Sequence, residues 1–165
     1  MSLICGIDPG LSGAVGFVTS AGEFVAVYDM PTLPTTTGRR QVDAAELAEI
    51  LREHSPTFAT VERVGARPGE GPTGAFSFGH TFGSITAVLA TLGLPHDLVQ
   101  PATWKRRAGI PPGADKGASV AVCKRLLRKA ADHLTRVKDD GRAEALLLAL
   151  HGRAGQIGAV AHLKT

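Results

Sequence analysis

Acidic side chains at the ends of predicted strands are the first candidates for chemistry in this sequence. Asp8 closes an apolar run, Leu3–Asp8, and is followed by Pro-Gly. The carboxyl ends of strands in α/β sheets commonly carry ligand-binding groups, and a carboxylate there is costly to bury unless water or a cation stabilises it. We interpret Asp8 as a candidate metal ligand; the alternative is an ordinary turn aspartate.

A second carboxylate interrupts another apolar run. Glu62 lies within Phe58–Val64, which reads FATVERV and has the composition of a buried strand. Central strands of such sheets are apolar throughout, so no local preference explains a glutamate in this place. Glu62 is therefore a candidate member of the same site, unless it forms a salt bridge near the end of its strand.

The segment KDDGRAEALLLAL supplies the remaining acids at the start of a predicted helix. Asp140 and Glu144 are four residues apart and share a helix face, offset by about 40°, where they repel each other unless a cation binds them. Asp139 points about 140° away from Glu144, and we expect it to cap the helix or face solvent. The alternative is a helix start whose acids interact with the helix dipole.

These four carboxylates predict a site for Mg²⁺, with Mn²⁺ as a substitute. Hard oxygen ligands without His or Cys suit these ions and do not suit zinc. Two such ions about 4 Å apart activate a water molecule and stabilise the leaving oxygen of a phosphodiester. The hypothesis is metal-dependent phosphodiester hydrolysis by Asp8, Glu62, Asp140 and Glu144.

The first half of the chain must place Asp8 and Glu62 on one sheet. Hydrophobic patterning and turn residues predict three strands, a Pro-, Thr- and Gly-rich loop, and then a helix that begins after an Asp43 N-cap. A fourth strand and a Gly-rich loop follow. The predicted ranges are Leu3–Asp8, Ala14–Thr19 and Glu23–Asp29 for the strands, Pro31–Arg40 for the loop, Phe58–Val64 for the fourth strand and Gly65–Gly74 for the second loop.

The second half alternates predicted helices with one further strand. The ranges are a helix from Ala75 to Leu92, a strand His96–Gln100, a short helix from Pro101, a basic helix Ala118–Ala131 and a last helix from Asp140 to Gly152. This order predicts an α/β fold in which helices cover both faces of one mixed sheet. We expect a single domain over residues 1–152 and a C-terminal tail over residues 153–165.

Composition excludes several other classes of protein. The chain is 44% apolar, an ordinary value for a globular protein. It contains no apolar run of the roughly 18 residues that a membrane span needs, and its first residues do not resemble a signal peptide. Cys5 and Cys123 have no metal-ligand spacing, so we expect a reducing, cytoplasmic setting.

Positive charge is concentrated in one third of the chain. Residues 105–138 hold ten Lys or Arg and two Asp, whereas the rest holds eight Lys or Arg and thirteen Asp or Glu. Such a block is typical either of a solvated helix face or of a surface that contacts a polyanion. The charge pattern alone does not decide between them.

Three blocks of the sequence resemble RuvC-type Holliday junction resolvases. The N-terminal block reads ICGIDPGLSGAVGF, the region around the second acid reads ATVERVGARPGEGPTGAFSFGHTFG, and KDDGRAEALLLAL is similar to the C-terminal motif of a phage and bacterial branch. The resemblance implies an RNase H-like fold with a five-stranded sheet, a homodimer, and cleavage of four-way DNA junctions by paired nicks with two Mg²⁺ ions. The best-known bacterial members end with two aspartates three residues apart, whereas here the spacing is four and the last acid is Glu144.

The sequence also predicts a set of DNA-binding residues, two of them through the resemblance. Lys105 and Lys116 correspond to basic positions near the scissile phosphate, and Lys116 is expected to act in catalysis. Arg67 lies in the loop after Glu62, where it can contact a phosphate, and Phe76 is a candidate for stacking on a base. Further basic residues are expected to give general binding: Lys124, Arg128 and Lys129.

Two apolar features have competing interpretations. The predicted helix from Ala75 to Leu92 is a candidate dimer interface; the alternative is that its apolar face only covers its own sheet. The residues concerned are Phe78, Phe82, Ile85, Val88 and Leu89. Trp104 is expected to pack its short helix against the sheet.

Three other functions remain open from the sequence. An actin-like nucleotide-binding protein also begins with a strand, an Asp and a Gly, but 165 residues leave no room for its second domain. A non-catalytic junction-binding protein would keep the basic block without a reason to keep four acids. Another RNase H-like nuclease, acting on RNA–DNA hybrids or flaps, would use the same acids.

Overall fold

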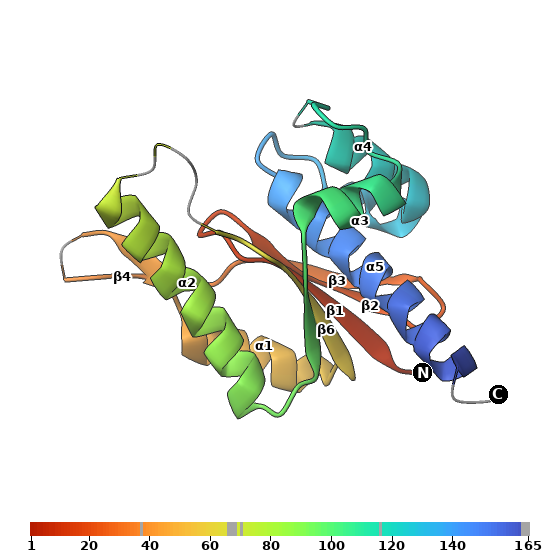
Figure 1. Cartoon of the computed structure of the whole chain (residues 1–165), viewed down its shortest axis with the longest axis horizontal. Coiled ribbons are helices and arrows are strands. Elements are labelled where there is room, and N and C mark those ends of the chain that lie inside the picture. The colour runs from red at the N-terminus through yellow and green to blue at the C-terminus, as the bar shows by residue number, and fades with distance from the viewer. Residues whose placement is uncertain (37, 66–68, 70, 116, 163–165) are drawn as a thin grey trace.

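The computed structural model has a five-stranded mixed sheet at its centre (Figure 1). It describes residues 1–36, 38–65, 69, 71–115 and 117–162, with side chains up to residue 154. The strands are β1 (Leu3–Asp8), β2 (Ala14–Thr19), β3 (Phe24–Asp29), β6 (Phe58–Glu62) and β7 (His96–Val99), in the order β3-β2-β1-β6-β7. The pairs β1–β2 and β2–β3 are antiparallel, whereas β1–β6 and β6–β7 are parallel.

Helices cover both faces of this sheet, as the sequence predicts. One face packs against α1 (Ala44–His54) and α2 (Pro72–Thr91). The other packs against α5 (Asp140–His162), with α3 (Pro101–Ala108), α4 (Gly117–Leu126) and the 3₁₀ helix η1 (Arg128–His133) gathered around it (Figure 1). Alternation along β1 separates the two cores, because Ile4 belongs to the α5 side and Cys5 and Ile7 to the α1–α2 side.

The helix α5 lies unusually close to β1. A Cβ at Gly6 would overlap the Ala145 carbonyl oxygen and the Ala149 amide. The small residues on both elements therefore allow backbone to meet backbone. This contact fixes the height of α5 above the strand that ends in Asp8.

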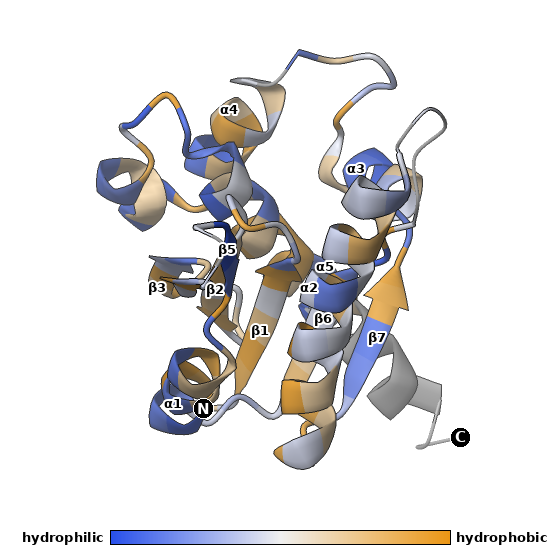
Figure 2. Cartoon of the chain, turned by 90° about the vertical axis from the view of Figure 1, so that its left-hand side faces the viewer, coloured by the Kyte–Doolittle hydropathy of each residue, from blue (hydrophilic) through white to orange (hydrophobic). Residues whose placement is uncertain are grey.

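Figure 2 shows toward which end of the molecule the carboxyl ends of the parallel strands point. The arrowheads of β1 and β7 point toward the end of the molecule at which α3 and α4 lie. β1 is largely apolar, whereas β7 changes from polar to apolar along its length (Figure 2). The carboxyl ends of the parallel strands thus meet the helices that carry the basic third of the chain.

The predicted loop Pro31–Arg40 is wrong in part. A short antiparallel hairpin forms from β4 (Thr32–Pro34) and β5 (Arg40–Val42). Its closing backbone bonds include Thr35 N–H to Arg39 O at 2.6 Å. The buried side chain of Val42 anchors this hairpin in the α1–α2 core, an anchor that turn-rich composition does not reveal.

Three helix boundaries also differ from their predictions. α2 begins at Pro72, inside the expected loop, because proline fits the first helical turn. The basic helix ends at Leu126 and continues as η1 after a break. α5 runs on through the expected tail to His162. The Asp43 cap is confirmed, since its carboxylate accepts the N–H groups of Ala45 and Glu46.

Two composition-based expectations can be compared with the structure. No helix in the part of the chain that the structure describes is long and apolar enough to cross a bilayer. Cys5 and Cys123 are buried and unpaired, and burial raises the pKa of the Cys123 thiol to about 12. Both cysteines are therefore core residues with little thiolate at neutral pH.

Candidate active site

Asp8 and Glu62 end two neighbouring parallel strands. β1 and β6 pair with Ile7 opposite Val61, so Asp8 and Glu62 follow at the same level. Ile7 and Val61 belong to the α1–α2 core. Because side chains alternate along a strand, Asp8 and Glu62 both face the opposite side, beneath the start of α5.

The first turns of α5 bring a second pair of acids to the same place. A Cβ at Gly141 would lie 3.1 Å from Asp8 Oδ2 and 2.7 Å from the Ser12 carbonyl oxygen. Asp140 precedes this contact and Glu144 lies one turn further along the helix, both partly exposed. The glycine therefore lets the start of the helix approach the carboxylate that ends β1.

The electrostatics of Asp8 reflect this gathering of acids. Burial, followed by the negative charges of Glu144 and Glu62, raises the pKa of the Asp8 carboxyl to about 7, and the positive charge of Lys105 opposes these effects. A cation bound among these carboxylates would reverse that effect, because an opposite charge nearby favours the ionised form.

Glu62 is held by a residue from α3. The indole Nε1 of Trp104 donates to Glu62 Oε2 at 2.7 Å, and the Trp104 side chain is fully buried. Its expected burial is confirmed, although α3 packs mainly against α5 rather than against the sheet. The hydrogen bond is an addition that the sequence did not predict. The bond fixes one oxygen of the carboxylate while the ring packs in the core around α5.

Glu144 has partners from two further helices. Lys105 Nζ lies 3.0 Å from Glu144 Oε1, and Ser119 Oγ of α4 donates to the same oxygen at 3.0 Å. The Lys105 ammonium also lies 5.1 Å from the centroid of the Trp104 ring. Lys105 therefore points into the carboxylate cluster, and its role at a phosphate stays a prediction.

The carboxylates do not form a finished metal cage. Among the described residues, no three Asp, Glu, His or Cys side chains lie together closely enough to hold an ion. Glu62 and Glu144 instead turn toward Trp104, Ser119 and Lys105. Their chemistry, all oxygen donors on adjoining elements, still fits Mg²⁺ or Mn²⁺.

Asp139 corrects one expectation. Its side chain is fully buried, so it does not face solvent. The carboxylate accepts the Arg136 N–H at 2.6 Å and the Arg136 Nε–H at 2.7 Å. Burial would raise the pKa of Asp139, but these bonds and the charges of Arg136 and Arg142 outweigh it and lower that pKa. Asp139 is thus occupied by arginine, while its neighbour Asp140 remains beside the site.

The structure describes some of the expected DNA-binding residues and not others. Phe76, near the start of α2, is 77% exposed, as a base-stacking residue must be. Arg128 and Lys129 are exposed on η1 and Lys124 is partly exposed on α4, in the helical layer around α5. Arg67 and Lys116 lie outside the described residues, so their roles stay predictions.

The predicted interface on α2 is wrong for its central residues. Ile85 and Leu89 are fully buried and Val88 is nearly so, all within the core beneath α1 and α2. Phe82 packs at the edge of the same core. The apolar face of α2 therefore covers its own sheet, which is the alternative that the sequence left open.

Comparison with known proteins finds similarity only at the level of structure. No family model and no curated protein matches the sequence. Thermus thermophilus RuvC in complex with a Holliday junction substrate superposes with a TM-score of 0.70 at 21% identity, covering 96% of this chain and 97% of that one. The chain has the RuvC fold. This superposition confirms the α/β, RNase H-like fold class predicted from the sequence.

Two further structures support the assignment of the RuvC fold. Another Thermus thermophilus RuvC structure gives a TM-score of 0.58 at 18% identity, with 94% of this chain and 96% of that chain covered. The yeast mitochondrial Holliday junction resolvase Ydc2 gives 0.56 at 16% identity, with 90% and 76% covered. The RuvC fold thus spans nearly the whole chain, including the elements that carry the four acids.

Proposed function

We propose that this chain is a Mg²⁺-dependent endonuclease that cuts four-way DNA junctions by paired nicks. One observation carries the proposal: on a RuvC fold, Asp8 lies among Glu62, Glu144 and Lys105, and burial and the acids raise its pKa to about 7. Such a cluster is unfavourable without a cation. The similar RuvC structure holds a Holliday junction, which supports this class of substrate.

Asp8, Glu62, Asp140 and Glu144 are the residues that would hold the metal. Bound there, two divalent ions would supply an activated water and charge stabilisation for the leaving oxygen; Mn²⁺ is expected to substitute for Mg²⁺. Trp104 keeps one oxygen of Glu62 directed toward α3. Ser119 and Lys105 orient Glu144 before the ion binds.

Lys105 has two successive roles in this proposal. Without metal, its ammonium partly neutralises Glu144 at 3.0 Å. With a divalent ion bound among the acids, the same ammonium would stabilise negative charge on the phosphate. Lys116 is proposed to act beside it at the scissile phosphate. Arg67, Lys124, Arg128 and Lys129 are proposed to bind the backbone and Phe76 to stack on a base.

One assay separates this function from its alternatives. Labelled four-way junction, linear duplex, flap and RNA–DNA hybrid are each incubated with the chain, with Mg²⁺ or with EDTA. We expect symmetrical nicks in the junction with Mg²⁺ only. Faster cutting of the hybrid or flap would indicate another RNase H-like nuclease, and binding without cutting would indicate a non-catalytic junction-binding protein.

A variant of the α5 aspartate tests the assignment of the acids. Asp140→Asn should abolish junction cutting and leave junction binding intact, because it removes a proposed metal ligand and one negative charge near the DNA. Single-turnover cleavage and gel-shift affinity measure the two effects. Normal cutting by Asp140→Asn would remove this residue from the proposed metal site.

A further inference from the structure

We propose that Asp29, Arg136, Asp139 and Arg142 form an arginine clamp that positions the first turn of α5, and with it Asp140 and Glu144, against Asp8. The inference rests on the proposed function, since it concerns the acids of that site. The four residues of the clamp are positioning residues, and none of them is assigned to the metal or to DNA.

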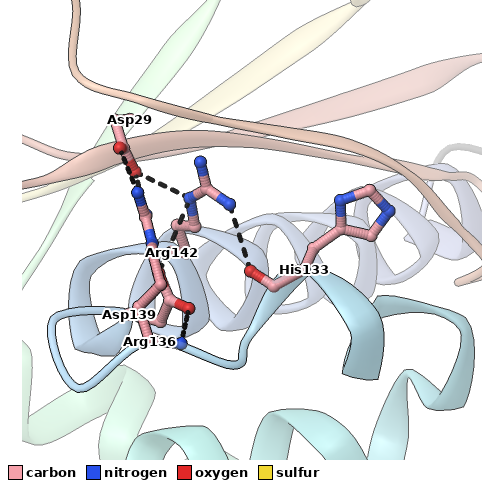
Figure 3. Close-up of polar contacts among 5 residues, drawn as sticks. All are labelled: Asp29, His133, Arg136, Asp139 and Arg142. Atoms are coloured by element: carbon pink, nitrogen blue, oxygen red, sulfur yellow. Dashed lines mark hydrogen bonds and ion pairs between the residues drawn. The ribbon is translucent and has the colours of Figure 1, made fainter.

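Arg136 is the centre of the clamp (Figure 3). Its Nη1 and Nη2 bind the Asp29 carboxylate at 2.8 and 2.6 Å, in the two-bond geometry that a guanidinium allows. Its Nε and its backbone N–H bind Asp139 at 2.7 and 2.6 Å. One arginine therefore uses its whole hydrogen-bonding edge to hold two carboxylates.

Arg142 closes the clamp from within α5. Its Nε donates to Asp29 Oδ1 at 2.7 Å, and its Nη1 donates to the His133 carbonyl oxygen at 3.1 Å (Figure 3). The end of β3, the segment after η1 and the first turn of α5 are thereby tied together. On the other side, Gly141 packs so close to the Ser12 carbonyl oxygen and Asp8 that a Cβ there would lie 2.7 Å and 3.1 Å from them, so this turn is fixed from two directions.

Burial makes the clamp intolerant of loosening. Asp139 is fully buried, and an ionised carboxylate in such a place is strongly destabilised if it loses its partners. Because Asp140 is its next neighbour in the chain, any displacement of Asp139 moves the acid beside the site. Groups that orient metal ligands in this way typically change metal affinity by about 10- to 100-fold when they are lost.

Metal binding in the absence of DNA is the direct test. Mn²⁺ is titrated into the unaltered chain, Asp29→Asn and Arg136→Lys, with free Mn²⁺ followed by electron paramagnetic resonance well below the melting temperature. Asp29 is the safest position, because its side chain is 45% exposed, and Asp132→Asn, an exposed aspartate on η1, is the matched control. Arg136→Lys keeps the charge and loses the planar fork.

We expect Mn²⁺ dissociation constants to rise about 10-fold for Asp29→Asn and Arg136→Lys, with no change for Asp132→Asn. Asp29→Glu should recover part of the affinity. Unchanged Mn²⁺ binding in a folded Asp29→Asn variant, whatever its melting temperature, would reduce the clamp to ordinary stabilisation and overturn the proposal. Should Arg136→Lys fail to fold, Asp29→Asn alone decides.

The Mn²⁺ titration separates a missing metal site from a metal site that does not depend on the clamp. An unaltered chain that binds no Mn²⁺ overturns the proposed metal site, and the clamp with it. Tight Mn²⁺ binding by the unaltered chain, with equal binding by the clamp variants, overturns the clamp alone.

Discussion

Charge at single residues controls the candidate site, and Asp8 shows this best. Its pKa of about 7 in the folded chain compares with an ordinary value of 3.8. Near neutral pH the metal-free chain therefore holds a proton that a bound cation would displace. Metal affinity should accordingly increase as the pH rises through about 7, because ligands must be deprotonated to bind.

The same residue predicts a pH-dependent stability. Between pH 4 and 7 the folded chain keeps a proton on Asp8 that the unfolded chain has lost, so the free energy of unfolding falls as the pH rises. Asp8→Asn should therefore raise the free energy of unfolding of the metal-free chain at pH 8 by about 2 kcal/mol. The full pKa shift of Asp8 corresponds to an upper limit of ~4 kcal/mol, and the expected gain is smaller because Asp8 is partly exposed.

Urea unfolding at pH 4 and pH 8, in EDTA, measures this difference. The gain should be largest at pH 8 and small at pH 4. Asp29→Asn is the control of opposite sign. The hydrogen bond from Arg136 lowers the pKa of Asp29, so its stabilisation is present above about pH 4 and Asp29→Asn should lower the free energy of unfolding at both pH values. Equal stability of Asp8→Asn and the unaltered chain at pH 8 would contradict the assigned electrostatics.

Trp104→Phe isolates one hydrogen bond at the residue scale. Phenylalanine keeps an aromatic ring in the core but removes the Nε1 donor to Glu62. A hydrogen bond to a charged group contributes about 1.5–3 kcal/mol, so we expect single-turnover cleavage to slow by about 10-fold or more. Far-ultraviolet circular dichroism should confirm a folded variant, and full activity in Trp104→Phe would show that this bond does not orient Glu62 for catalysis.

At the scale of elements, the approach of α5 to β1 places the acids. The parallel register of β1 and β6 aligns Asp8 with Glu62. The backbone contact at Gly6 sets the distance at which α5 crosses above them. Site geometry thus depends on residues that carry no chemistry of their own.

Gly6→Ala tests this dependence. Its methyl group would overlap the Ala145 carbonyl and the Ala149 amide, so α5 must move away from the sheet. Overpacking typically costs about 1–3 kcal/mol, and we expect a loss at the upper end with a marked loss of cleavage. Gly83→Ala on α2 is the matched control, because nothing lies within 4 Å of its added methyl group. Thermal melts and cleavage rates are measured for both, and an unchanged Gly6→Ala would contradict the close contact.

At the scale of the whole molecule, paired nicking requires two copies of the chain. A four-way junction has near two-fold symmetry, and two symmetric cuts need two sites in matching orientation. We therefore predict a homodimer, whose surface lies away from Ile85, Val88 and Leu89 because these residues are used within the chain. Sedimentation of the free chain and of its junction complex measures this, and a monomer in both states would refute it.

The sequence by itself determined most of the elements and predicted a set of candidate acids. Apolar runs predicted β1 and β2 to the residue, and the Asp43 cap predicted the start of α1. Positions within predicted strands and at a helix start made Asp8, Glu62, Asp140 and Glu144 candidates. These features have local signatures, because strand alternation, helix period and capping act over a few residues. The hairpin at Thr32–Val42 has no such local signature, because its Pro-, Thr- and Gly-rich sequence is typical of a loop.

Only the tertiary structure decided which partners hold the acids. Trp104 reaches Glu62 across 42 residues of sequence, and Arg136 reaches Asp29 across 107. No periodicity or motif encodes such pairs, since they arise where separate elements pack together. The same packing buried Asp139, for which spacing had predicted either a helix cap or a solvent-facing side chain, and used the apolar face of α2 inside the chain. Spacing within a helix gives the direction of a side chain around that helix, but burial depends on what the fold brings to that side.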